Sequence, residues 1–246
     1  MLRYARTDAL CLVRSVYFLV FSVVFSAAFY LMFTVVVRDA LSSSPGFARD
    51  YMLAMSVSGA FFGALNGAGI RLGMERGDGW SRQVLLTPLT SRSYLAAKAI
   101  TAWLLTLPAM ACVFLIGAMV NDVSLAPVRW LAAAGTLWLA SLVFVAAGLV
   151  VGLLAAGEKA QFLALAVFFP LAMLGGLWFP IDSFPGVLKA IADYLPTRAI
   201  YQLVELASGA VSGSPATPLL VLALWLAALS ALALSRSRPA TLLAVG

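Results

Sequence analysis

Few residues of this 246-residue chain have the side chains that catalysis or metal binding requires. The chain contains no histidine, so it offers neither an imidazole base nor a histidine metal ligand. Its two cysteines, Cys11 and Cys112, lie far apart in different segments, which fits neither a metal cluster nor a disulfide framework. Serine and threonine are plentiful, but none has a convincing base beside it. We therefore predict no catalytic residue, no metal site and no cofactor bound by this chain.

The composition is that of a membrane protein. Hydrophobic residues make up 63% of the chain and charged residues 11%, whereas soluble domains are about 45–50% apolar and about 25% charged. The apolar runs are continuous over about 20 residues, as in transmembrane helices, and do not alternate as barrel strands do. We predict an all-α integral membrane protein. Its net charge of +6 fits basic cytoplasmic loops and does not indicate nucleic-acid binding.

Six membrane spans can be drawn along the chain. At 1.5 Å per residue, each is long enough to cross a hydrocarbon core of about 30 Å. The spans are Ser15–Val37, Tyr51–Ile70, Tyr94–Val120, Trp130–Ala156, Phe162–Phe179 and Pro218–Ser235.

The segment before the first span has the pattern of an interfacial helix. Arg3, Thr7 and Arg14 fall on one helical face, and apolar residues fall on another. Such a helix lies with its apolar side in lipid and its basic side toward anionic headgroups. The apolar residues are Leu2, Ala5, Ala9, Leu12, Val13 and Val16.

The distribution of Lys and Arg predicts the orientation of the spans. One set of loops, with both termini, carries eleven basic residues, and the opposite set carries five. Because cytoplasmic loops are enriched in Lys and Arg, the first set is expected inside the cell, in a plasma membrane. The five residues of the outer set are Arg38, Arg49, Arg129, Lys189 and Arg198.

The cytoplasmic loop Met74–Lys98 is much longer and more charged than a simple connection needs. Asp78 is expected to cap a short helix, "WSRQVLL", that Thr87 and Pro88 end. Ser91 is expected to cap the third span. Trp80, Val84 and Leu85 are expected to anchor the short helix at the membrane surface, with Arg82 and Gln83 facing water. A long ordered loop is usually functional.

Glycines predict close helix packing. Gly59, Gly63 and Gly67 recur every four residues in the second span, and Gly148 and Gly152 repeat the pattern in the fourth. The packing partner could lie in this chain or in a second copy. Asn66, beside the first stripe, is expected to bond a neighbouring helix or to line a pathway.

The segment Gly175–Pro218, on the outer side, predicts two short amphipathic helices that cannot cross. Pro180 and Pro185 interrupt the fifth span's continuation, and "GVLKAIADYL" follows, ending at Pro196. "TRAIYQLVELASG" then begins with Thr197 as its expected cap. Each is expected to dip into the outer leaflet as a re-entrant helix.

These features together resemble the ABC-2 family of transporter permeases, particularly its drug and antibiotic exporters. The likeness covers most of the chain and rests on six spans, the amphipathic N-terminal helix and two motifs. The inner motif falls on Glu75, Arg76, Leu85, Thr87, Pro88, Tyr94 and Lys98, with Leu85 one position from the usual spacing. The outer motif falls on Gly175, Gly176, Phe179, Pro180, Leu195 and Pro196.

The resemblance implies one transmembrane domain over residues 1–246 that works with other subunits in the lipid bilayer. Its coupling helix would seat in a separate ATP-binding subunit, which would hold ATP and Mg. This chain has no G-x-x-x-x-G-K-[ST] motif. Six spans would form half a transporter, completed by a second permease as a homodimer or heterodimer. The coupling residues implied are Glu75, Arg76, Asp78, Trp80, Arg82, Thr87 and Pro88.

The expected cargo is a hydrophobic or amphiphilic compound, such as an antibiotic, another drug or a lipid. No Asp or Glu lies well inside the spans, which disfavours an ion-coupled secondary transporter. A non-transporting membrane scaffold remains an alternative. The candidate pathway is apolar and aromatic, with packing or lipid-facing roles as the alternative for its residues. They are Phe61, Phe62, Asn66, Phe168, Trp178 and Phe179.

Overall fold

The structure is a computed structural model that describes residues 16–36, 46–181 and 184–237, and these contain helices and no strands. The expected interfacial helix before the first span lies outside the described residues. The elements are α2 (Val16–Leu31), η1 (Met32–Val36), α4 (Phe47–Ala64), η2 (Leu65–Ile70), α5 (Arg71–Gly77), α6 (Trp80–Leu85), α7 (Ser91–Val120), α8 (Pro127–Ala140), α9 (Leu142–Leu154), α10 (Glu158–Leu174), α11 (Gly186–Ala192), α12 (Pro196–Ser208) and α13 (Ala216–Arg236).

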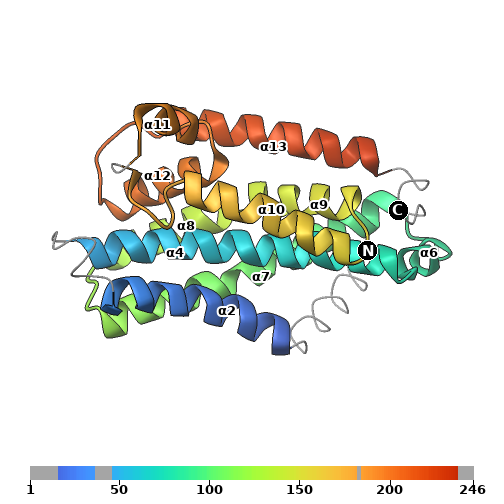
Figure 1. The fold of residues 1–246 in the computed structure, drawn as a ribbon, viewed down its shortest axis with the longest axis horizontal. Helices are drawn as coiled ribbons and strands as arrows, with labels where there is room; N and C mark the ends of the chain where they lie inside the picture. Colours follow the sequence, from blue (N-terminus) through green and yellow to red (C-terminus); the bar gives the residue numbers. More distant parts are fainter. Residues whose placement is uncertain (1–15, 37–45, 182–183, 238–246) are drawn as a thin grey trace.

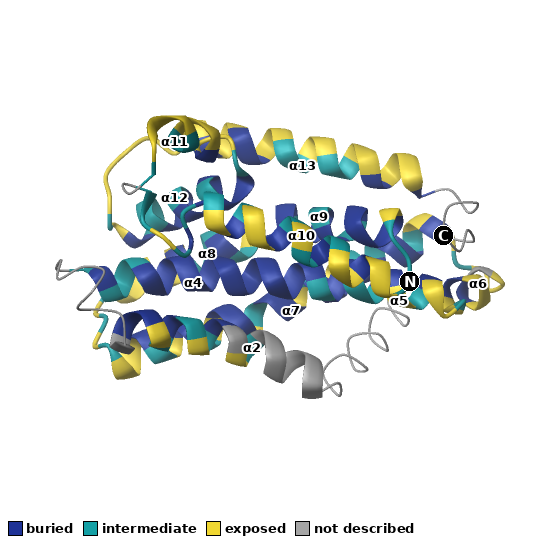
Figure 2. Cartoon of the chain, in the orientation of Figure 1, coloured by how far each residue is buried: buried dark blue, intermediate teal, exposed yellow. Residues whose placement is uncertain are grey.

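The long helices run along one axis, with short helices at both ends of the bundle (Figure 1). The α6 helix lies at the end where α5 and α10 meet their loops, and α11 and α12 lie at the opposite end. The central element is α4, whose residues from Tyr51 to Ala64 are all buried (Figure 2). The α13 helix is mostly exposed and lies along the edge of the bundle.

Four helices of the described chain are long and apolar enough to cross a membrane: Phe47–Gly77, Ser91–Val120, Pro127–Leu154 and Ala216–Arg236. The expected count of six also includes α2 with its continuation η1, and α10, which has 17 residues. The second span is longer than predicted, because η2 and α5 continue α4 to Gly77. The fourth is interrupted at Ser141, between α8 and α9. The fifth ends at Leu174, before the predicted Phe179.

The glycine stripes pack within this chain. A Cβ atom built on Gly67 would lie 3.2 Å from the Cα of Ala102 in α7, and one on Gly59 would meet Ser26 of α2. A Cβ atom built on Gly148 would lie 2.8 Å from Ala64 O, and one built on Gly152 would lie 2.6 Å from Gly69 O. The second and fourth spans therefore approach each other at backbone distance, which requires residues without side chains.

Candidate functional site

The charged loop folds as two helical pieces joined by a tight turn. The turn residue Gly79 has φ = 75° and precedes α6 without any side-chain cap. Asp78 instead ends α5, so its expected role as a cap for α6 is wrong. The third span is capped one residue early, because Thr90 Oγ1 accepts a hydrogen bond from the Ser93 amide at 3.2 Å. Glycine fits this turn because its missing Cβ allows positive φ.

One side of α6 is held against the bundle. Ser81 is 1% exposed and Val84 is 5% exposed, although α6 lies at the extreme end of the molecule. Val84 belongs to a cluster of buried apolar residues that includes Leu72 of α5 and Tyr94 of α7. After the helix ends, Thr87 Oγ1 donates a hydrogen bond to Val84 O at 2.6 Å. These contacts fix α6 to both α5 and α7.

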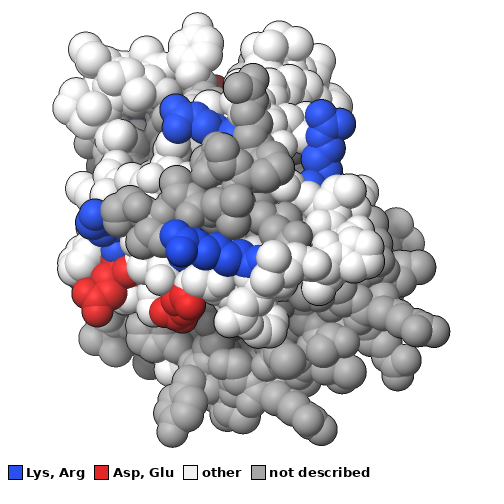
Figure 3. Space-filling view, turned by 90° about the vertical axis from the view of Figure 1, so that its right-hand side faces the viewer, with Lys and Arg blue, Asp and Glu red and all other residues white. Residues whose placement is uncertain are grey.

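The other side of α6 faces outward. Arg82 and Gln83 are exposed, as predicted, and Thr87 and Pro88 are exposed after them. Two apolar side chains share this surface, since Trp80 is 46% exposed and Leu86 is 89% exposed. Figure 3 views the molecule from this end, where basic and acidic side chains both reach the surface. An apolar surface with charged neighbours is typical of a protein-binding patch.

Behind α6, Glu75 of α5 joins three partners from two helices. Its carboxylate accepts a hydrogen bond from Arg71 Nε at 3.1 Å and from the Tyr94 hydroxyl at 2.5 Å. Lys98 Nζ lies 2.5 Å from the same carboxylate, and this lysine is 1% exposed. A buried ammonium needs such a partner, because an unpaired charge away from water is costly. Glu75 therefore ties α5 to α7.

The neighbouring Arg76 ties α5 to the end of α9. Its Nη1 donates hydrogen bonds to the carbonyls of Gly152 at 2.7 Å, Leu153 at 2.9 Å and Ala155 at 3.3 Å. The last carbonyls of a helix have no partner within it, so a guanidinium placed there satisfies them. Close by, the Gly157 amide donates to Gly73 O at 2.8 Å.

The opposite end of the bundle is built around a turn after α10. Thr197 Oγ1 donates a hydrogen bond to Leu171 O at 2.7 Å, so it does not cap α12, and Pro196 is already the first helical residue. A Cβ atom on Gly175 would lie 2.7 Å from Leu171 O and would clash with Thr197. Gly176 follows with φ = 77°. The motif glycines therefore let α12 lie directly against the end of α10.

Comparison with known proteins identifies the family. The family model described as "ABC-2 family transporter protein" matches residues 38–235. The chain belongs to the ABC-2 transporter family. It is also 30% identical, over 184 residues, to the protein named "Putative transport permease YvfS" of Bacillus subtilis (strain 168), covering 75% of each chain. No solved structure gave a significant match. The chain is thus a multi-pass membrane subunit of transport-permease type.

Two charged residues of the loop in this ABC-2 protein lie mostly buried in the structure. As implied coupling residues, Glu75 and Arg76 would lie at the surface with Arg82, but the Glu75 side chain is 15% exposed and Arg76 is 6% exposed. The i,i+4 spacing of Arg71 and Glu75 is visible in the sequence. The contacts to Lys98 and to the α9 carbonyls are not, because they depend on how distant helices pack.

The residues of the outer motif lie in the turn after α10 and at or just before the starts of α11 and α12. Pro196 is buried at the start of α12, while Pro180 and Pro185 both precede α11, with Pro180 half-buried and Pro185 exposed. Phe179 is 40% exposed. The apolar face of α11 is not covered by the rest of the described chain, since Val187 is 74% exposed and Ile191 is 46% exposed; its entry into the membrane stays a prediction. The covered stripe of α12 is formed by Ala199, Ile200 and Leu203.

The candidate pathway residues come together in an aromatic cluster. Phe168 contacts Phe61, Phe62 and Trp178 at ring-centroid distances of 5.3, 5.2 and 6.0 Å. Phe61 and Phe168 are almost fully buried, and Phe61 also lines an apolar cavity of about 280 Å³. The bond that Asn66 makes within the described residues is to its own helix, where its Nδ2 donates to Phe62 O at 2.8 Å, and not to a neighbouring helix. The role of these residues in transport stays a prediction.

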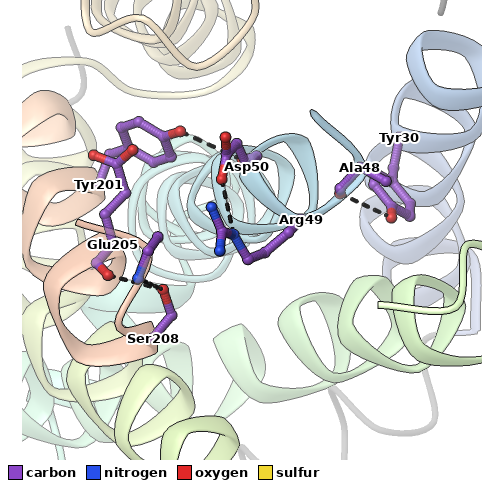
Figure 4. A network of polar contacts seen from close by, with 8 residues as sticks. Tyr30, Ala48, Arg49, Asp50, Tyr201, Glu205 and Ser208 are labelled. Atoms are coloured by element: carbon purple, nitrogen blue, oxygen red, sulfur yellow. Dashed lines mark hydrogen bonds and ion pairs between the residues drawn. The ribbon is translucent and has the colours of Figure 1, made fainter. Parts of the chain in front are cut away.

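A polar region at the end of the ABC-2 bundle opposite α6 was not foreseen from the sequence. Figure 4 shows Glu205 and Tyr201 of α12 facing Asp50 and Arg49 of α4. Arg49 Nε lies 3.0 Å from Asp50 Oδ1, and the Tyr201 hydroxyl donates to Asp50 O at 3.5 Å. Burial raises the pKa of the Glu205 carboxyl, and the positive charge of Arg198 opposes that rise. These charges lie between two segments that are separated by about 150 residues, so no sequence spacing indicates them.

Proposed function

We propose that this chain is the transmembrane subunit of an ATP-driven exporter and that α6 is its coupling helix. The observation that carries the proposal is that α6 is buried on one side and exposed on the other. Its inner side is fixed by Ser81 and Val84, and its outer side presents Arg82, Gln83 and Leu86. A helix that is held rigidly yet left uncovered at one end of a bundle can transmit a partner's movement into the bundle.

The contacts behind α6 would transmit that movement to the long helices. Glu75 joins α5 to Lys98 and Tyr94 of α7, and Arg76 joins α5 to the end of α9. Because α5 continues α4 without interruption, a force on α6 would act on three of the long helices. ATP and Mg would be held by a separate ATP-binding subunit that docks on α6.

The assembly proposed has two permease subunits, identical or different, in the plasma membrane with both termini in the cytoplasm. Its cargo would be a hydrophobic or amphiphilic compound, such as a drug, an antibiotic or a lipid. The aromatic cluster and the apolar cavity beside Phe61 support such a cargo. The export direction and the cargo class follow the family resemblance of the loop and outer motifs.

The test is to reconstitute the permease with its ATP-binding subunit in proteoliposomes and to measure ATP hydrolysis and amphiphile efflux. Arg82→Glu combined with Leu86→Asp should abolish both activities while leaving the permease folded, because both side chains are exposed. Arg92→Glu is the matched control, being exposed at the same end but outside α6. Normal efflux by the double variant would refute the coupling role.

A further inference from the structure

Two cavities lie in sequence along one face of α13. The outer cavity, of about 700 Å³, is lined from α13 by Thr217, Pro218 and Val221. The inner cavity, of about 280 Å³, is lined by Trp225 and Leu229 of the same helix. Thr217, Val221, Trp225 and Leu229 are each four residues apart, so they share one helical face. At 1.5 Å per residue this face extends over about 18 Å.

The two cavities differ in chemistry, because only the outer one is lined by charged side chains. The outer one is lined by polar and charged residues of α12 and of the turn before it, together with apolar residues such as Leu206, Val211 and Val221. The polar and charged residues are Asp193, Tyr194, Arg198, Gln202 and Glu205. The inner one has apolar walls. They are formed by α9, α10, α13, Phe61 and Pro196, and include Val143, Ala147, Val150, Leu163 and Val167.

At the boundary between the two cavities, residues that line the polar compartment lie next to residues that line the apolar one. Pro196, the first residue of α12, lines the inner cavity, and Arg198 lines the outer one two residues later. Trp225 Nε1 donates a hydrogen bond to Tyr194 O at 2.9 Å, which ties α13 to the turn before α12. The indole thus has its polar edge on the outer cavity's wall and its ring in the inner cavity, as tryptophans do at polar–apolar boundaries.

The charges of the outer cavity favour a positively charged group. Two carboxylates, Asp193 and Glu205, line it with one guanidinium, Arg198, which lies 5.6 Å from the Tyr201 ring centroid. The other nearby guanidinium, Arg49, is paired with Asp50 at 3.0 Å. Asp50 and the same Glu205 and Arg198 line an adjoining cavity of about 310 Å³. A tyrosine ring, Tyr194, completes the wall, and aromatic rings attract ammonium groups.

We propose that the paired cavities form one binding site for a single-chain amphiphile with a cationic head, placing its head beside Glu205 and its chain along Trp225 and Leu229. The order of a charged compartment and a carbon-lined compartment along one helix face matches the shape of such a molecule. The inner compartment is the cavity beside Phe61, so the inference rests on the amphiphilic cargo of the proposed function, but it does not rest on ATP-driven coupling through α6.

The experiment is photolabelling of the full chain in phosphatidylcholine nanodiscs, without any ATP-binding subunit. The probe is dodecyltrimethylammonium with a diazirine at the end of its chain, and labelled residues are found by mass spectrometry. The proposal expects saturable labelling on the α9 and α13 segments around Val150 and Leu229. Unlabelled dodecyltrimethylammonium should displace the probe, and dodecyl sulfate should not.

Two variants separate the head and chain contacts. Glu205→Gln should raise the half-saturating probe concentration about tenfold, as expected on losing a partly buried charged partner. Ala147→Phe should fill the inner cavity and remove the labelling there. Glu158→Gln, an acid at the opposite end, and Leu224→Phe, an exposed position of α13, are controls that should bind the probe normally.

Thermal unfolding and elution profiles establish that each variant is folded, and Asp193→Asn replaces Glu205→Gln if the latter is not. Equal displacement by dodecyl sulfate would overturn the proposal, as would labelling spread over the lipid-facing surface. Wild-type labelling in the folded head and chain variants would also overturn it. None of these outcomes bears on coupling through α6, because no ATP-binding subunit is present.

Discussion

The single side chain of Glu75 connects two helices, although it lies in a loop that looks solvent-exposed in the sequence. It is the shared partner of Arg71, Tyr94 and Lys98. Half of this arrangement could be predicted, because Arg71 and Glu75 are four residues apart on one helix. The other half could not, because Lys98 lies 23 residues further along the chain and reaches Glu75 only when α7 packs beside α5.

We predict that Glu75→Gln lowers the permease's free energy of unfolding by about 3 kcal/mol, since it leaves the buried Lys98 ammonium without its counter-charge. Unfolding of the purified protein in mixed micelles measures this change. The matched control is Asp78→Asn, three residues later and exposed, which should change the same quantity by less than about 0.5 kcal/mol. Equal effects for the two variants would show that Glu75 is not the anchor described here.

Asn66 marks a limit of reasoning from residue type alone. A buried amide in a membrane helix predicts a bond to another helix. In the structure it donates to Phe62 O, four residues earlier, within the π-helical segment η2. A π-helical turn changes which backbone carbonyls are available, and nothing in the sequence around Asn66 identifies that turn.

Among the elements, the long apolar helices were predicted well and their ends less well. Hydrophobic runs locate α7 and α13 to within three residues of the predicted spans. The extension of α4 through α5 and the shortened α10 were missed. Their ends depend on Arg76 bonding to α9 and on Thr197 bonding to Leu171, both of which are tertiary contacts.

The close packing of η2 against α9 predicts that a glycine-to-alanine change there destabilises the permease, whereas the same change at an open position of α8 stabilises it. Gly152→Ala would place a Cβ atom 2.6 Å from Gly69 O, so it should destabilise the permease by about 1–3 kcal/mol through overpacking. Gly135→Ala in α8 meets nothing within 4 Å and should stabilise it by up to about 1 kcal/mol through helix propensity. Thermal unfolding in the same detergent compares them. Destabilisation by Gly135→Ala, or none by Gly152→Ala, would contradict the packing.

For the molecule as a whole, the charge distribution predicts opposite sides of the membrane for α6 and the α12–α13 loop. Gln83→Cys and Ser212→Cys, both exposed, should test this in a background without Cys11 and Cys112. An impermeant maleimide applied to intact cells that express the permease without its ATP-binding subunit should label position 212 alone, and lysis should make position 83 reactive. Labelling of both positions from outside would refute the orientation.

The whole-molecule account depends most on what covers α6. A photocrosslinking amino acid, p-benzoylphenylalanine, at Gln83 in native membranes tests this directly, with the same group at Arg92 and Ser212 as exposed controls. We predict a crosslinked product from position 83 that contains an ATP-binding protein with a P-loop, and none from position 212. Position 92 should give much less of it. If position 83 captures no ATP-binding protein, or captures it no better than position 212 does, α6 is not the coupling helix.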